Sequence, residues 1–291
     1  MKTLRSMLFV PGDSEKKQAK AFSSQADALI LDLEDSVSPA RLPVARQMVR
    51  AYLAEHPRQN QAVWVRINPL QTDLALQDLA AVMPGRPDGI VLPKPLNAQD
   101  MVKLDHFLSA FETREGVALG ATLIIPIATE LPGALFELHT YAGASQRLAG
   151  MTWGAEDLAT AVGASNNKAA NGDFDFTYQM ARSMCLLAAS HAQVQAIDTL
   201  TVDFRDEAAL RKEVLRARQA GFTGKLAIHP DQVLPIHECF QPSDAELTQA
   251  QRIVDAFAHA QGAGAVQLDG KMVDKPHLSQ ALRLLELASK E

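Results

Sequence analysis

Two adjacent carboxylates, Glu156 and Asp157, follow a short apolar stretch that ends at Gly154, with no Lys or Arg close by in the sequence. Removing such a pair from water is costly unless a cation or plentiful water accompanies it. A hard divalent metal ion is a suitable partner for these oxygens. The same residues also suit the start of a helix, where acidic side chains favour the N-terminal dipole. This segment alone does not decide between a metal site and a helix start.

The elements that would position these carboxylates are short apolar runs alternating with helix-like segments. The segments 179–192 and 206–220 have amphipathic composition, and Gly221 is well placed to end the second. Strands that alternate with helices indicate a parallel sheet, and eight such units predict a closed (β/α)₈ barrel. An open doubly wound sheet is the main competitor, weakened because no Gly-x-Gly-x-x-Gly follows an early strand. The eight predicted strands are 6–10, 28–33, 62–67, 89–92, 122–127, 148–153, 194–198 and 225–228.

Polar side chains follow these strands at their carboxyl ends. In a barrel all eight ends share one rim, and active sites of barrel enzymes lie there. This convergence predicts an enzyme, although a purely structural barrel would also place polar groups on that rim. The residues concerned are Asp32, Glu34, Asp35, Arg66, Asn68, Lys94, Thr129, Glu130, Glu156, Asp157, Asp198 and His229.

Composition narrows the class of protein. The 291 residues are 47% hydrophobic and 21% charged, which fits a soluble globular protein, and the net charge of −6 argues against a general nucleic-acid binder. Only Cys185 and Cys239 are present, so a reducing compartment is expected rather than a disulfide framework. The first residues lack a signal-peptide pattern and no apolar stretch is long enough to span a bilayer. We expect a cytoplasmic protein without membrane contact.

An ordered set of short motifs carries a resemblance to a known family. The chain resembles the citrate lyase β-subunit-like group of the HpcH/HpaI aldolase superfamily, and the matches extend in order from residue 5 to residue 274. The resemblance implies a (β/α)₈ barrel, a Mg²⁺-type metal, and cleavage or formation of a C–C bond in a 3-hydroxyacyl-CoA. It also implies homotrimers or dimers of trimers. The matching segments are 5–12, 32–37, 65–68, 92–94, 154–158, 227–230 and 269–274.

The resemblance divides the chain into a barrel over residues 1–235 and a C-terminal extension over 236–291. It implies that Asp274 reaches the active site of a neighbouring subunit and serves there as the acid/base. Gly262, Gly264 and Gly270 punctuate this extension, a pattern that suits a mobile lid. From the residues alone, Asp274 would be read as a surface-loop aspartate.

The metal ligands implied by the resemblance are Glu130 and Asp157, holding Mg²⁺ or Mn²⁺. One departure matters: the family pattern after the fifth strand has Glu where this chain has Thr129, and Glu130 comes one place later. In a regular strand a shift of one residue turns the side chain to the other face. A β-bulge could restore its direction. Glu130 is the only carboxylate of the segment, so we expect it to be the ligand.

The remaining candidates support the reaction. Arg66 would stabilise negative charge developing on a carbonyl or enolate oxygen, or form a rim salt bridge, or both. Further acids and one lysine would orient Arg66 or water on the metal: Asp32, Glu34, Asp35, Lys94 and Glu156. His229 precedes Pro230 and is expected to be structural. Cations for the CoA phosphates would come from Arg5, Lys16 and Lys17.

These expectations amount to a lyase that cleaves citramalyl-CoA, malyl-CoA or citryl-CoA to acetyl-CoA and a 2-oxo acid. Four alternatives stay open: the β-subunit of a multi-subunit citrate lyase acting on an acyl-carrier-protein thioester, a malate-synthase-like thioesterase, an α-keto-acid aldolase without CoA, and a non-catalytic metal-binding scaffold. The sequence does not fix the acyl group, because one methyl or carboxymethyl group changes the pocket's shape rather than a motif.

Overall fold

The computed structural model describes residues 3–56, 61–260 and 262–289. Contacts within the chain divide it into two compact units, Met1–Ile236 and His237–Glu291. No helix in these ranges is long and apolar enough to cross a membrane.

The first unit is a barrel of eight strands, all paired in parallel, in the order β5-β4-β3-β2-β1-β8-β7-β6. The two end strands approach through isolated bridges, Ile124 to Leu148 and Ile127 to Thr152, so the ring is nearly closed. The predicted (β/α)₈ fold is confirmed, and each strand overlaps a predicted run. The strands are β1 Ser6–Pro11, β2 Ala28–Asp32, β3 Ala62–Arg66, β4 Gly89–Leu92, β5 Leu123–Pro126, β6 Gly150–Thr152, β7 Gln195–Asp198 and β8 Gly224–Ala227.

The strands read as continuous apolar runs because both of their faces are buried, one in the barrel and one under helices. Side chains from several strands fill one apolar cluster, and Trp64 is its largest member. Gly89 makes room for this ring, since a Cβ there would lie 2.2 Å from it. The other buried members are Leu4, Met7, Ala28, Ile30, Val91, Ile125, Ile127, Ile197 and Leu226.

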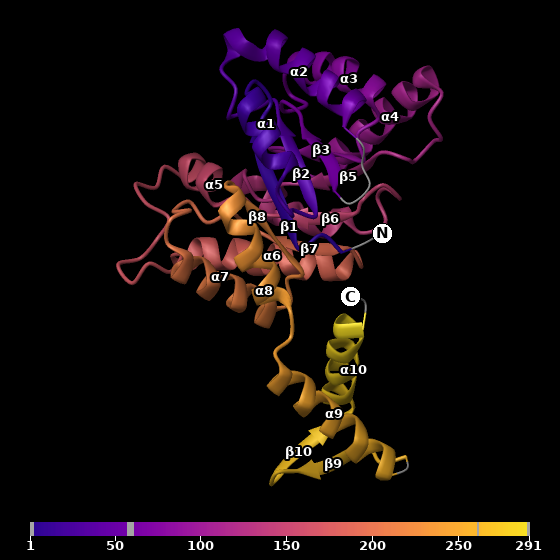
Figure 1. The fold of residues 1–291 in the computed structure, drawn as a ribbon, viewed down its shortest axis with the longest axis vertical. Coiled ribbons are helices and arrows are strands. Elements are labelled where there is room, and N and C mark those ends of the chain that lie inside the picture. The colour runs from indigo at the N-terminus through magenta and orange to yellow at the C-terminus, as the bar shows by residue number, and fades with distance from the viewer. Residues whose placement is uncertain (1–2, 57–60, 261, 290–291) are drawn as a thin grey trace. The chain divides into compact units, whose positions relative to one another are not determined.

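Helices surround the strands, with α2, α3 and α4 on one side of the barrel in Figure 1 and α6, α7 and α8 on the other. The predicted ends of α7 are confirmed: the Asp206 side chain accepts the Ala209 N–H, and Gly221 ends the helix at φ +115°. The α-helices are α1 Glu15–Phe22, α2 Leu42–Glu55, α3 Leu74–Val82, α4 Ala98–Glu115, α5 Ala155–Val162, α6 Phe176–His191, α7 Glu207–Ala220 and α8 Val233–Phe240. The 3₁₀ helices are η1 Pro39–Arg41, η2 Met83–Gly85, η3 Pro132–Tyr141 and η4 Pro230–Gln232.

The second unit consists of two helices and a hairpin: α9 Asp244–His259, β9 Ala265–Leu268, β10 Lys271–Asp274 and α10 Lys275–Ser289. A capping box between Ser243 and Glu246 starts α9. The hairpin turns at Asp269 and Gly270, both with positive φ, as an Asp-Gly turn requires. Of the three glycines that punctuate this segment, Gly270 lies in the hairpin turn, and Gly262 and Gly264 precede β9; the expected helical extension is present.

Candidate active site

The carboxyl ends of the strands bring seven charged residues together at the barrel rim. We call this set the rim cluster: Asp32, Glu34, Asp35, Arg66, Lys94, Glu130 and Asp157. Ion pairs and hydrogen bonds link its members across β2, β3, β4 and the segments after β5 and β6. Residues separated by up to 125 positions therefore share one site.

Arg66 is the fixed cation of the rim cluster. Its guanidinium forms a bidentate pair with Asp32, at 2.6 and 2.7 Å, and a third contact with Glu34 at 2.9 Å. The Phe9 ring lies beneath it, 4.8 Å from the guanidinium carbon. Burial would raise the pKa of Asp32, but the charge and hydrogen bonds of Arg66 hold that pKa below its ordinary value. Arg66 is thus both a salt-bridge residue and a positioned one, as its two expected roles allow.

Lys94 is the second cation of the rim cluster. Both its backbone N–H and its side-chain ammonium contact carboxylates. Its backbone adopts φ +51°, and its N–H donates to Glu130 at 2.5 Å. Its ammonium lies 2.5 Å from Glu34, 3.1 Å from Asp35 and 3.3 Å from Asp157. Burial would lower the pKa of Lys94, but the carboxylates of Glu34, Glu130 and Asp157 raise it. The ammonium therefore stays charged at the centre of the acids.

Glu130 and Asp157 form a carboxylate pair. Glu130 is 2% exposed, and its side chain is hydrogen-bonded to that of Asp157. Burial raises the pKa of Glu130 well above its ordinary value, and the charges of Asp157 and Glu34 raise it further. Gly154 leaves the space for this pair, because a Cβ there would lie 2.7 Å from Cγ of Glu130. Two carboxyl groups in hydrogen-bond contact repel each other when both are charged, so a shared proton or a nearby cation must stabilise the pair.

The structure explains why Glu130, not Thr129, faces Asp157. Strand β5 ends at Pro126 and the chain then turns, so the alternation of a regular strand no longer applies at residues 129 and 130. The Thr129 hydroxyl instead accepts the Gly154 N–H at 3.3 Å. A turn, rather than the bulge considered from the sequence, gives Glu130 its direction.

The residues present fit a hard divalent cation. Within the described ranges no group of three or more His, Cys, Asp and Glu side chains is arranged to hold a metal. The rim cluster nevertheless holds five carboxylates against two cations, and Glu130 and Asp157 offer oxygen ligands side by side. Mg²⁺ is often held by one or two carboxylates while keeping several waters. This donor set suits Mg²⁺ or Mn²⁺.

Some predicted residues do not join the rim cluster. Glu156 is exposed and accepts a hydrogen bond from Asn167 Nδ2 at 2.8 Å, so it does not support the Glu130 and Asp157 pair as expected. Successive residues of a helix differ in direction by 100°, and Glu156 and Asp157 lie in the first turn of α5. The helix-start interpretation of the sequence therefore applies as well.

The cations expected to bind CoA are dispersed. Arg5 precedes β1, at the opposite end of the barrel from the rim, and pairs there with Asp27 at 3.4 Å. We therefore no longer include Arg5 among the CoA-binding candidates. Lys16 and Lys17 lie exposed on α1, which follows β1 at the rim.

The other polar residues at strand ends serve the fold. Asn68 donates to the Leu33 carbonyl and to Asp78, both at 2.8 Å. His229 caps η4, with its Nδ1 accepting the Asp231 N–H at 3.3 Å, which agrees with the structural role expected for it.

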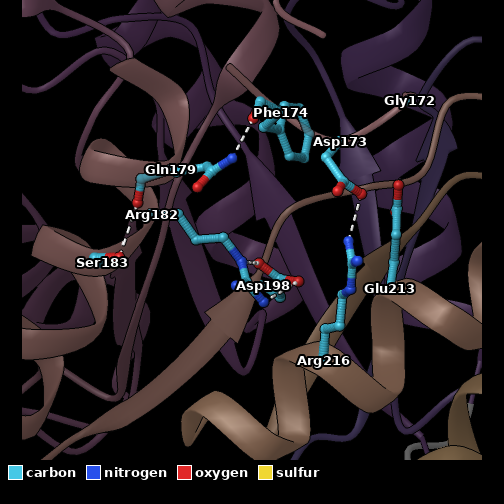
Figure 2. Close-up of a pocket in the computed structure, with 9 residues that line it drawn as sticks. All are labelled: Gly172, Asp173, Phe174, Gln179, Arg182, Ser183, Asp198, Glu213 and Arg216. Carbon is cyan, nitrogen blue, oxygen red and sulfur yellow. Dashed lines mark hydrogen bonds and ion pairs between the residues drawn. The ribbon is translucent and has the colours of Figure 1, made fainter. Parts of the chain in front are cut away.

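Asp198 belongs to a separate cavity of about 420 Å³ between α6 and α7 (Figure 2). Arg182 reaches Asp198 with two nitrogens, at 2.9 and 3.1 Å, and Arg216 pairs with Asp173 on the other side of the cavity. The Asp198 carboxylate also accepts the indole N–H of Trp153 at 2.7 Å. Asp198 thus connects β6, α6 and β7 rather than joining the rim cluster.

Asp274 lies in the second unit, at the end of β10. Its Oδ1 is 2.5 Å from Nδ1 of His277, and its own backbone N–H points to the same nitrogen at 3.3 Å. Hydrogen bonding from His277 lowers the pKa of Asp274 below its ordinary value.

Sequence reasoning missed two residues of these sites, Phe9 and His277. It also missed the packing role of Gly154. Phe9 lies in an apolar run that also reads as plain core, so nothing distinguished it. His277 carried a usable signal, because it follows Asp274 by three residues at the start of an amphipathic helix.

Comparison with known proteins identifies the family. The HpcH/HpaI aldolase/citrate lyase family matches residues 5–230. The chain belongs to this family. The resemblance read from the motifs is confirmed, and the chain is an enzyme of the aldolase/citrate lyase type.

Known relatives match this chain over nearly its whole length. The citrate lyase subunit beta of Haemophilus influenzae is 36% identical over 99% of this chain and 98% of its own. The mitochondrial citramalyl-CoA lyase of Mus musculus is 31% identical over 98% of this chain and 86% of its own. The crystal structure of CitE from Mycobacterium tuberculosis with magnesium, acetoacetate and coenzyme A is 30% identical, with a TM-score of 0.84, over 99% and 98% of the two chains.

Proposed function

We propose that this protein is a metal-dependent carbon–carbon lyase. It cleaves a 3-hydroxyacyl-CoA of the citramalyl-CoA, malyl-CoA or citryl-CoA type to acetyl-CoA and a 2-oxo acid. The observation that carries this proposal is the contact between the Glu130 and Asp157 carboxyls beside an anchored Arg66. The relatives support it, because one is named a citramalyl-CoA lyase and another was crystallised with magnesium and coenzyme A.

Glu130 and Asp157 would hold Mg²⁺ or Mn²⁺. A metal ion at these oxygens would polarise and orient the substrate's hydroxyl and carboxylate as a Lewis acid. The other acids of the rim cluster maintain the negative field that favours the cation, and Glu34 and Asp35 hold Lys94 in position.

Arg66 supplies the positive charge for the reacting oxygen. When the C2–C3 bond breaks, its electron pair moves into the thioester and leaves an enolate, whose oxygen carries the developing charge. Asp32 binds one edge of the guanidinium through two hydrogen bonds, so Arg66 needs no reorganisation when this charge appears. Fixed donors of this kind contribute more than mobile ones.

Asp274 is the proposed acid/base. It would act in the site of a neighbouring subunit of a homotrimer or dimer of trimers, so that each complete site combines the rim cluster of one chain with the extension of another. In cleavage, the C3 hydroxyl loses a proton as the new carbonyl forms, and the enolate carbon gains one. Lys16 and Lys17 are the remaining candidates for the CoA phosphates.

The first experiment is a panel of CoA esters assayed with Mg²⁺, following acetyl-CoA and the 2-oxo acid. Cleavage of one ester that stops with EDTA and resumes with Mg²⁺ supports the lyase. Release of free CoA without an equal amount of acetyl-CoA would indicate a thioesterase instead, and no turnover of any ester would favour the scaffold.

A second experiment tests the shared site. Glu130→Gln and Asp274→Asn are each expected to be inactive, but each defect lies in a different half of the site. Subunit exchange between the two variants should create sites with both residues intact and restore part of the activity. If oligomers shown to be mixed stay inactive, Asp274 does not act across subunits.

The alternative function is the β-subunit of a multi-subunit citrate lyase that acts on an acyl-carrier-protein thioester. The observation that favours it is the 36% identity to a citrate lyase subunit beta over almost all of both chains. Citryl thioesters of CoA and of an acyl-carrier protein, compared at equal concentration, separate the two functions through their kcat/KM values.

A further inference from the structure

Asp274 and His277 form a hydrogen-bonded pair in the second unit. Asp274 ends β10, and His277 lies three residues later on α10. Oδ1 of Asp274 and Nδ1 of His277 are in direct hydrogen-bond contact, at 2.5 Å. In the single chain the His277 side chain is 50% exposed and that of Asp274 is 37% exposed, so the imidazole is the more accessible partner of the pair.

The contacts of Nδ1 define two proton arrangements. When Nδ1 carries a proton, it donates to the Asp274 carboxylate. When Nδ1 is unprotonated, it acts as an acceptor. The Asp274 backbone N–H points to it at 3.3 Å, and a protonated Asp274 carboxyl also donates to it. The same geometry therefore accommodates the proton on either partner, because each arrangement leaves Nδ1 with a donor or an acceptor.

We next consider which other titratable groups lie near Asp274 in the described part of this unit. Across the hairpin the residue opposite Asp274 is Ala265, which cannot titrate. Lys275 follows Asp274 along the chain, and Asp269 at the hairpin turn is paired with Arg252 of α9. Of the charged groups that face Asp274 from the described residues of α9, β9 and α10, His277 is the one in hydrogen-bond contact.

We propose that His277 is the proton relay of Asp274, exchanging the proton of the acid/base with solvent through its imidazole ring. This inference rests on the proposed role of Asp274 in the lyase. It assigns His277 a role in proton transfer beyond its hydrogen bond at the start of α10.

The relay can be written for the condensation direction. Oδ1 of Asp274 takes a proton from the acetyl methyl group, and the C–H electron pair becomes the thioester enolate. The proton then passes from Oδ1 to Nδ1 of His277 while the Nε2 proton leaves to water. The carboxylate is regenerated and the imidazole ends as the other neutral tautomer. Cleavage runs the same transfers in reverse, so protons and charge balance in both directions.

Three variants separate relay from positioning. His277→Ala removes both functions. His277→Asn keeps an amide group near the place of Nδ1 and can hold Asp274, but it carries no exchangeable ring proton. His259→Ala is the matched control, since His259 is an exposed histidine on α9 that bonds the Asp255 carbonyl of its own helix.

The readouts are kcat, KM, the pH profile, and deuterium exchange into the methyl group of acetyl-CoA in D₂O. We expect His277→Ala to lose about tenfold or more in kcat and in exchange rate, with KM nearly unchanged, because acid–base groups contribute roughly 10²–10⁴-fold. His277→Asn should stay impaired, and added imidazole should restore both rates in His277→Ala. His259→Ala should behave as wild type.

Two results would overturn the relay: wild-type kcat in His277→Ala, or full recovery in His277→Asn, which would make His277 a positioning residue only. Failure of the proposed function looks different. In that case Asp274→Asn itself retains activity, or wild type cleaves no CoA ester, whatever residue occupies position 277.

Discussion

Two ion clusters of the barrel lie at opposite ends of its strands, and they differ in how far their charges are satisfied. The rim cluster lies at the carboxyl ends of the strands. The second cluster, which we call the base cluster, joins Arg147 before β6 to Asp105 and Glu112 of α4. Arg147 is 4% exposed, and Glu112 is 0% exposed.

Every contact in the base cluster stabilises its charges. Arg147 reaches Asp105 at 2.5 Å and both oxygens of Glu112 at 2.7 Å, and it also bonds the Thr122 carbonyl. Glu112 receives two further backbone N–H groups, from Gly120 and Thr122. Burial would raise the pKa of Glu112, but these bonds hold it below its ordinary value.

The rim cluster leaves its charges partly unsatisfied. Burial raises the pKa of both Glu34 and Glu130. The Lys94 ammonium lies near Asp157, but five carboxylates share only Arg66 and Lys94. A buried carboxylate whose pKa is raised by neighbouring carboxylates is a candidate for ligand binding. Glu130 is of this kind, because burial and the charges of Asp157 and Glu34 raise its pKa, whereas Arg147 and two backbone N–H groups hold the pKa of Glu112 down.

The largest effect should follow from removing the metal-binding carboxylates. Glu130→Gln and Asp157→Asn should each lose more than about 10²-fold in activity, since ligand loss impairs metal use at least as strongly as loss of a supporting group. The thermal shift caused by Mg²⁺ should disappear in both. Thr129→Ala is the control and should retain metal-dependent activity. Full activity in EDTA-treated wild type would contradict the metal role of the rim cluster.

The base cluster should respond in stability rather than activity. Arg147→Met leaves the buried Glu112 charge without its partner and should cost about 3–5 kcal/mol of unfolding free energy. Urea unfolding measures this loss. Arg114→Met is the control, because Arg114 lies on α4 with Glu112 but its side chain is half exposed. Combining Arg147→Met with Glu112→Gln should recover part of the loss, and an unchanged loss would mean that the charge of Glu112 is not its cause.

The two clusters should also give opposite pH dependences. Glu112 has a lowered pKa, so its contribution to stability is present above its ordinary value of 4.5 and is lost as the pH falls through the lowered pKa. Glu130 has a raised pKa, so the metal-free fold loses stability as the pH rises from 4.5 through that raised value.

Glu130→Gln should therefore make the metal-free protein more stable at pH 8, by a few degrees in Tm, with the advantage shrinking toward pH 5. Mg²⁺ should reverse the order at pH 8, because only wild type binds it. Melting curves in EDTA and in Mg²⁺ across this pH range provide the measurement. A Glu130→Gln protein that is less stable than wild type throughout would refute the charge deficit.

The sequence predicted the barrel well because its strands are buried on both faces and read as short apolar runs between helical segments. It also predicted most of the rim cluster, since a barrel places all carboxyl strand ends on one rim. Arg5 was a wrong choice for that rim for the same geometric reason, because it precedes its strand.

What the sequence could not predict depends on local backbone direction. The turn after Pro126, which directs Glu130 to Asp157, depends on contacts with Gly154 that lie 24 or more residues away. The left-handed φ of Lys94 brings both its N–H and its ammonium to acids, and nothing in the Pro93-Lys94 motif specifies that conformation. The base cluster joins residues of unremarkable segments, so no motif marked it.

The smallest expected effect concerns Lys94, the cation that already lies among the rim acids. Its ammonium contacts Asp157 and Glu34, so it offsets part of the charge that a metal ion would offset. Loss of the Lys94–Asp157 pair in Lys94→Met should lower the stability of the metal-free protein by about 1 kcal/mol or less, since both side chains of that pair are partly exposed to water. The same change should increase the thermal shift that Mg²⁺ causes, because the bound ion then meets a larger uncompensated charge. Lys16→Met, an exposed lysine on α1, is the control and should change neither quantity. A smaller Mg²⁺ shift in Lys94→Met would mean that Lys94 organises the carboxylates for the metal rather than competing with it.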